Sequence, residues 1–146
     1  MSTSLLYHAF GIRGYQYQGT KYHSGEMTIR ISQAREKLCC PSCRSSKVRI
    51  IERFERRWRT VPIGSRSTWI TMSVAKVECQ ECFARRRVSV PFAEPHKHHS
   101  RAFQRYVVGL LRCMTPQDVS RHLSISWDTA NDIQKRRLKK KFGRPK

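Results

Sequence analysis

Alternating apolar and polar positions predict β-structure in the first part of the chain. Residues 15–18 and 27–31 alternate in this way, and Ser24-Gly25 between them is a turn signal. We therefore predict a β-hairpin within residues 1–37, preceded by a short N-terminal turn, that packs against the following domain.

The same alternation continues further along the chain. Residues 54–61 and 70–74 alternate on either side of a predicted turn at residues 63–66. Residues 84–90 read as a last strand that Pro91 ends, because proline cannot donate to a strand ladder. This part of the chain is therefore expected to be built from strands with little helix.

From residue 100 the apolar spacing becomes helical. Ser100 is a candidate N-cap for a first helix, and Thr115 followed by Pro116 is a start signal for a second, short helix. Ser126 is expected to cap a third helix that runs to about residue 142. The positions expected to face inward are Phe103, Tyr106, Val107, Leu110 and Met114 in the first helix, Val119 and Leu123 in the second, and Trp127, Ala130, Leu138 and Phe142 in the third, with Ile133 at its edge.

A helix, a short helix, a tight turn and a longer basic helix predict a helix-turn-helix over residues 100–142. The third helix can then lie in the DNA major groove, where base edges carry a distinctive pattern of donors and acceptors. A plain three-helix packing unit is the alternative. Residues 93–99 are expected to be a solvated linker, which we prefer to a second metal site because the spacing of its three histidines (His96, His98 and His99) fits no common ligand pattern.

Two C-x-x-C motifs are the strongest chemical signal, and they define a domain over residues 38–92. Cys40 and Cys43 form the first and Cys79 and Cys82 the second, with 35 residues between them. Four thiolates complete the tetrahedral shell of a structural zinc ion, so we predict one Zn²⁺ in a zinc-ribbon-like domain. Disulfides or unrelated core cysteines are the alternative. Cys39 could in principle replace Cys40, but Cys40 alone gives the two-residue spacing.

Charge then indicates the partner. The chain has 30 Lys and Arg against 10 Asp and Glu, a formal net charge of +20, which favours a polyanion such as nucleic acid. No apolar run is long enough to span a bilayer, and no signal peptide is evident. We therefore expect a cytoplasmic, nucleoid-associated protein with no membrane partner, in a compartment that keeps thiols reduced.

The candidate DNA contacts lie on the third helix and on two basic strands. The acids are scattered, and no Gly-rich phosphate loop or nucleophile motif accompanies them, so an enzyme is not expected. The side chains predicted to contact DNA are Thr129, Asn131, Lys135, Arg136, Lys139, Lys140 and Lys141 on the helix, and Arg57, Arg59 and Arg86 on the strands. Residues 143–146 are expected to be a basic tail.

These motifs, in this order, resemble the N-terminal region of the bacterial ISL-type insertion-sequence transposases. The resemblance rests on the two knuckles, on the Arg-Arg-Trp-Arg strand at residues 56–59 and on the segment from Met114 to Asp128. Ser120 and Ser124 depart from the family pattern, which has Ala and a turn Gly there. In that family a catalytic domain of RNase H-like fold follows, with three carboxylates that bind metal ions.

The resemblance implies the DNA-end-recognition part of a transposase without its catalytic domain, because the sequence stops about where that domain begins. Its expected partner is double-stranded DNA at terminal inverted repeats, together with a possible homodimer or a separately encoded catalytic domain. A small transcriptional regulator or repressor of a mobile element is the alternative function, and a protein-interaction module is a third. The overall prediction is an α+β fold, with a small β-rich zinc-ribbon-like domain followed by a three-helix helix-turn-helix unit.

Overall fold

The computed structural model describes residues 3–143. The chain divides into two compact units, Met1–Ser100 and Arg101–Lys146, and each is described on its own. The predicted segments 1–37, 38–92 and 93–99 all belong to the first unit, and their further division stays a prediction. Of the predicted basic tail, residues 144–146 lie outside the described residues. None of the described helices combines the length and apolar character needed to cross a membrane.

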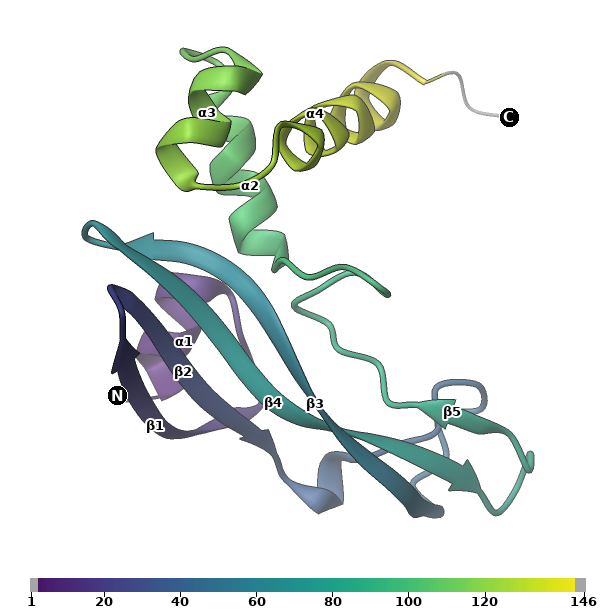
Figure 1. Ribbon diagram of the computed structural model, residues 1–146. Helices are drawn as coiled ribbons and strands as arrows, with labels where there is room; N and C mark the ends of the chain where they lie inside the picture. Colours follow the sequence, from purple (N-terminus) through teal and green to yellow (C-terminus); the bar gives the residue numbers. More distant parts are fainter. Residues whose placement is uncertain (1–2, 144–146) are drawn as a thin grey trace. The chain divides into compact units, whose positions relative to one another are not determined.

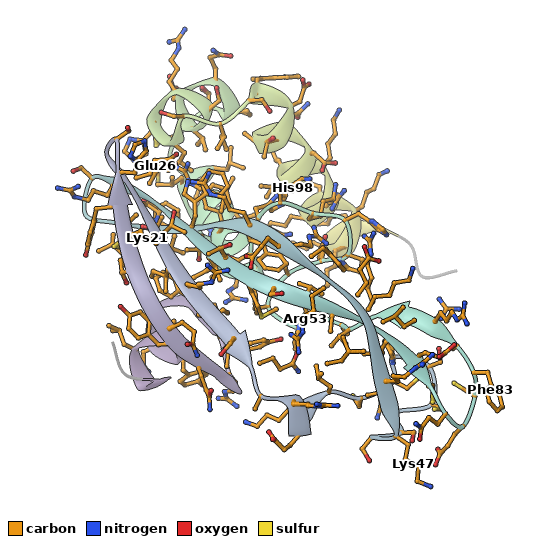
Figure 2. The ribbon with its side chains drawn as sticks, turned by 60° about the horizontal axis from the view of Figure 1, so that its bottom comes forward. Lys21, Glu26, Lys47, Arg53, Phe83 and His98 are labelled. Atoms are coloured by element: carbon orange, nitrogen blue, oxygen red, sulfur yellow. The ribbon has the colours of Figure 1, made fainter. Side chains whose placement is uncertain are left out.

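The first unit is built on one five-stranded sheet (Figure 1). Its strands are β1 (Tyr15–His23), β2 (Glu26–Gln33), β3 (Val48–Ile63), β4 (Arg66–Cys79) and β5 (Arg85–Arg87). The order is β1-β2-β4-β3, and β5 also pairs with β4. All pairs are antiparallel except β2 and β4, which run parallel. In Figure 2 Lys21 and Glu26 lie near one end of the sheet, and Lys47 and Phe83 lie at the other.

Two tight turns make the hairpins that were predicted. Ser24 and Gly25 both have positive φ, 47° and 78°, and they join His23 to its partner Glu26. Positive φ at both central residues matches the twist of the flanking strands, which is why such turns favour two-residue hairpins. Gly64, with φ of 60°, lies in the second turn, where Ile63 pairs with Arg66. Both predicted turn positions are therefore confirmed.

The larger core lies on one face of the sheet. Ile29, Ile70 and Trp58 from three different strands are fully buried there, as expected from their alternation. The N-terminal segment covers this face as a helix, α1 (Thr3–Phe10), rather than the predicted short turn (Figure 1). Leu6 and Phe10 lie one helical turn apart and are both buried in this core, so tertiary packing stabilises a helix too short to be stable alone.

A smaller core lies beneath the two cysteine knuckles. Leu38 follows a 3₁₀ turn, η1 (Arg35–Lys37), and packs with Ala75 and Val77 of β4 and with Val88. We call residues 38–50 and 75–88 the knuckle end. The last strand is shorter than predicted, because β5 ends at Arg87 and Val88 turns into this core.

Residues 93–99 are not the solvated linker that was predicted. The backbone N–H of Arg59 donates to His98 at 2.8 Å, and that of Ser100 donates to the Arg59 carbonyl at 2.8 Å. Ala93 and His99 are buried. Ser100, expected as a helix cap, is also buried, and its hydroxyl donates to Thr60 Oγ1 at 3.1 Å. This segment lies along the edge of β3, because the backbone N–H and C=O groups of an edge strand can bond to a further segment.

The second unit is a three-helix arrangement of α2 (Arg101–Leu110), α3 (Pro116–Leu123) and α4 (Trp127–Phe142). Thr115 caps α3 by accepting from the Asp118 N–H at 3.2 Å. Ser126 caps α4 by accepting from the Thr129 N–H at 3.2 Å. Both predicted caps are therefore confirmed. The core contains Phe103, Val107, Val119, Leu123, Ala130 and Ile133.

The buried face of α4 differs from the predicted one. Ile133, placed at the edge by sequence, is buried together with Ala130, whereas Trp127, Leu138 and Phe142 are exposed. For Leu138 and Phe142 the reason is helix length, because α4 has 16 residues whereas α2 and α3 have 10 and 8. At ~1.5 Å per residue, the short helices cannot cover the whole of α4.

We expect Ser124→Gly to stabilise the second unit. Ser124 ends α3 in the left-handed conformation, with φ 51° and ψ 49°, which glycine adopts without the steric cost borne by other residues. The gain should be about 0.5–1 kcal/mol, measured by hydrogen exchange of α3 and α4 amides in the intact chain. Ser120→Gly, the same change inside α3, should lower stability instead. Slower exchange in the Ser120 variant, or faster exchange in the Ser124 variant, would contradict this account.

Candidate metal centre and nucleic-acid interface

The two knuckles are matching turns at the same end of the sheet. Cys79 is the last residue of β4 and pairs with Val48, the first residue of β3, so the long β3–β4 hairpin brings the second knuckle back to the first. In each knuckle the sulfur of the first cysteine faces the turn backbone. Cys40 Sγ accepts from the Ser42 N–H at 3.4 Å, and Cys79 Sγ accepts from the Glu81 N–H at 3.4 Å.

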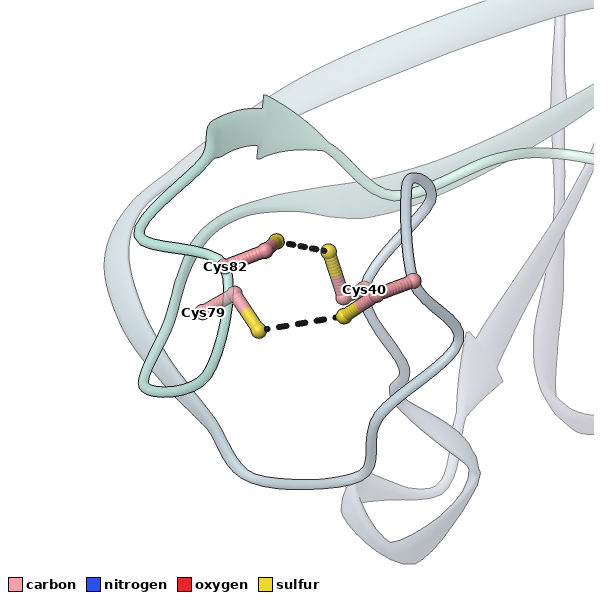
Figure 3. Close-up of side chains that lie close together, drawn as sticks. Cys40, Cys79 and Cys82 are labelled. Atoms are coloured by element: carbon pink, nitrogen blue, oxygen red, sulfur yellow. Dashed lines mark hydrogen bonds between the residues drawn. The ribbon is translucent and has the colours of Figure 1, made fainter.

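The four sulfur atoms converge on one point (Figure 3). Sγ of Cys40 lies 3.6 Å from that of Cys82, Sγ of Cys43 lies 3.5 Å from that of Cys79, and all four sulfurs lie within 4.8 Å of one another. Ligands at ~2.3 Å from a tetrahedral zinc ion are about 3.8 Å apart. All four cysteines are free rather than disulfide-bonded. This cluster could therefore hold one Zn²⁺ with no open position, which is the arrangement of a structural site.

The backbone of each knuckle favours a thiolate on its first cysteine. A hydrogen bond from the Cys43 backbone, with a second from Ser42, lowers the pKa of Cys40 to about 6. The Cys82 and Glu81 backbones lower the pKa of Cys79 in the same way. The Ser45 backbone lowers the pKa of Cys43, but the neighbouring thiols outweigh it and raise that pKa to about 12. Crowded thiols resist ionising together, and a divalent cation would relieve this repulsion.

The structure separates the cluster from the other candidate ligands. The converging sulfurs include that of Cys40 and not that of Cys39. Cys39 is exposed and free, and is therefore a spare thiol. Among residues 3–143, the four cysteines are the one set of three or more His, Cys, Asp or Glu side chains placed to hold a metal ion.

Helix α4 presents most of the predicted DNA contacts to solvent. Lys135, Arg136 and residues 139–141 are exposed, and Arg136 pairs with Asp132 at 3.1 Å one turn earlier. Nearer the start of the helix, Thr129 and Asn131 are half-buried. The Thr129 hydroxyl is 2.8 Å from that of Ser126. The helix therefore carries a cationic surface beyond its first two turns.

The predicted strand arginines differ from one another. Arg86 is exposed on β5. Arg57 is also exposed, but its guanidinium bonds to Glu26 at 2.6 Å and lies 3.9 Å from the centre of the Trp69 ring. Arg59 is only 7% exposed, and burial lowers its pKa. The prediction that Arg59 contacts DNA is therefore not supported, because its neighbours cover the side chain.

One exposed residue at the knuckles was not singled out from the sequence. Phe83 directly follows the second cysteine of its knuckle and is 78% exposed. The sequence signal that could have identified Phe83 is its place between a predicted zinc ligand and the arginines at residues 85–87. A side chain on a knuckle turn has few neighbours that could bury it.

Comparison with known families gives two matches to neighbouring parts of the chain. Residues 36–82 match the family described as zinc-finger of transposase IS204/IS1001/IS1096/IS1165. Residues 88–138 match the family described as helix-turn-helix domain of transposase family ISL3. The first match contains both knuckles, and the second contains most of residues 93–142. No curated protein and no solved structure matches the chain.

Proposed function

We propose that this chain, which carries the zinc-ribbon and helix-turn-helix domains of ISL3 transposases, recognises the ends of an insertion sequence by placing α4 in the major groove of double-stranded DNA. The observation that carries the proposal is the exposed cationic surface of α4, on a helix whose first turn is fixed by the Ser126 cap. Phosphate contacts would position the helix, and side chains near its start would read bases.

The two parts of α4 suit these two tasks. Lys135, Arg136 and residues 139–141 are exposed cations that suit phosphate contact. Thr129 and Asn131 lie within the first two turns of the helix, which is where recognition helices contact base edges. Asparagine is suited to adenine because its amide can donate and accept at once. We therefore propose Asn131 as the main base-reading side chain, with Thr129 beside it.

We further propose that the DNA sites are terminal inverted repeats. The transposase families matched by both domains support this target. Two copies of the chain, one on each repeat, would follow the symmetry of such sites. We propose a cytoplasmic, nucleoid-associated location because the partner is DNA and because a four-thiolate site requires a reducing compartment. In this proposal the zinc site shapes the first unit and takes no part in chemistry.

The test is base-specific recognition by Asn131. Selection from random duplexes should yield a consensus sequence, and Asn131→Ala should bind that sequence about 5–150-fold more weakly, which corresponds to ~1–3 kcal/mol. Its affinity for random duplex should change little, because phosphate contacts remain. Fluorescence anisotropy with both duplexes measures the two effects.

Gln16→Ala is the matched control, since Gln16 is an exposed amide on β1 and should alter neither affinity. Selection that returns no consensus would refute sequence recognition. Equal weakening on consensus and random duplexes would instead exclude Asn131 as the base-reading residue.

A further inference from the structure

The residue after the second cysteine of each knuckle has a left-handed backbone. These residues are Arg44, with φ of 61°, and Phe83, with φ of 55°. Their shared position shows that the knuckle turn itself requires this conformation. Both side chains are exposed, so the residue type at this position decides what the turn presents to solvent.

Phenylalanine is an unfavourable choice for this position. A left-handed backbone is costly for bulky residues, whereas glycine and asparagine adopt it readily. Phe83 is also 78% exposed, more than Phe142 or Tyr22, so packing within the unit does not offset the cost. In Figure 2 it lies at the edge of the molecule and points away from the ribbon. Strained backbone conformations cluster at sites that contact ligands, so the strained turn makes this exposed ring a candidate contact with a partner.

The charges around Phe83 indicate the kind of partner. Three carboxylates near the knuckles are already engaged by cations. Glu78 pairs with Arg49 at 2.6 Å and with Arg85 at 2.7 Å, Glu81 pairs with Lys47 at 3.4 Å, and Glu52 pairs with Lys76 at 4.0 Å. Arg44 and Arg86 are exposed and add further positive charge. An aromatic ring surrounded by excess positive charge is suited to contact a polyanion that also has flat apolar faces. Nucleic acid has both features.

We propose that the tip of the second knuckle is a nucleobase-contacting site, in which the ring of Phe83 packs against the face of a base while Arg86 contacts a neighbouring phosphate. This rests on the proposed function, since it supposes that the chain binds DNA, and it adds a second contact to that of α4. The ligand is the flat face of a nucleobase, supplied either by a single strand or by an unstacked step of a duplex.

The test compares apolar and ionic contributions to DNA affinity in the full-length zinc protein. Phe83→Gly removes the ring and relieves the backbone, so folding and zinc content should be preserved. Affinity should fall about 5–150-fold, as for the loss of one base–aromatic contact, with no change in the slope of log affinity against log salt. Phe83→Trp should retain affinity. Arg86→Gln should lower the slope by about 0.9 on duplex or about 0.7 on a single strand.

The probes are a random 30-base-pair duplex and a thirty-residue thymidine oligonucleotide, and Tyr22→Ala is the control for loss of an exposed aromatic elsewhere. A loss with Phe83→Gly on the oligonucleotide alone assigns the site to single strands, and a loss on the duplex assigns it to an unstacked step. Unchanged affinity on both, with wild-type protein binding normally, overturns this inference. If the wild-type protein binds neither probe, it is the proposed function that fails.

Discussion

Removing zinc is expected to unfold the knuckle end of the first unit and to leave its larger core folded. Zinc bound to four cysteines contributes about 10–16 kcal/mol. The small core there has three large buried side chains, Leu38, Val77 and Val88, which contribute ~1.5–3 kcal/mol each. The larger core, around Trp58 and Ile70, lies at a distance along the same strands. Chelation should therefore abolish amide protection in residues 38–50 and 75–88 while protection at Ile29 and Ile70 persists.

Cysteine variants separate the metal site from general thiol effects. Cys79→Ser should reproduce the chelated state, and added zinc should not restore protection. Cys39→Ser changes the neighbour of a ligand but lies outside the cluster, so zinc content and exchange should match the wild type. Hydrogen exchange with mass spectrometry, together with metal analysis, gives both readouts. Full protection of the knuckle end after chelation would rule out zinc as its stabiliser, whereas loss of the whole unit would show that the two cores fold as one.

DNA affinity is expected to depend steeply on salt, and the end of α4 should account for part of that dependence. If about 6–10 phosphates are contacted, affinity falls ~10³–10⁵-fold between 50 and 200 mM salt. Lys139, Lys140 and Lys141 are exposed, so replacing all three with Gln should lower the slope of log affinity against log salt. The decrease should be about 0.9 for each lysine that contacts a phosphate.

Net charge alone also affects affinity, so the control removes the same charge elsewhere. Lys21, Arg35 and Lys37 are exposed in the first unit, and replacing these three with Gln should leave the slope near its wild-type value. Equal effects of the two triple variants would mean that general attraction, rather than α4, dominates binding. An unchanged slope in the α4 variant would place the phosphate contacts on other residues.

The features predicted correctly from sequence are those set by local chemistry. The Ser24-Gly25 turn needs residues that tolerate positive φ, and the Thr115 and Ser126 caps need a hydroxyl at a helix start. The two C-x-x-C turns follow from the two-residue spacing within each knuckle, although it is the β3–β4 hairpin that brings them together. Each of these signals lies within four residues, so the sequence shows it without knowledge of the rest of the fold.

The features missed depend on contacts between distant segments. Helix α1 forms because Leu6 and Phe10 meet the sheet, which no local cap or composition indicates. The parallel pairing of β2 with β4 joins strands whose mutual register no hairpin turn fixes. Arg59 reads as a surface arginine in an alternating strand, yet segment 98–100 and Trp69 cover it. In α4 the lengths of the neighbouring helices, rather than its own periodicity, decide which residues are buried.

The paired length of the β3–β4 hairpin fixes the distance between its turn and the cysteine cluster. Its register pairs Ile63 with Arg66 at one end and Val48 with Cys79 at the other. One residue inserted into β4 between these points would move Cys79 out of step with Val48 and reverse the faces of the side chains beyond the insertion. Residues added at Gly64, beyond the last pair, would leave the spacing of the cysteines intact. Changes in hairpin length are therefore tolerable at the tip. Within the strands an unmatched residue has to be absorbed by a bulge, as β3 does between Ile50 and Glu52 and between Thr60 and Ile63.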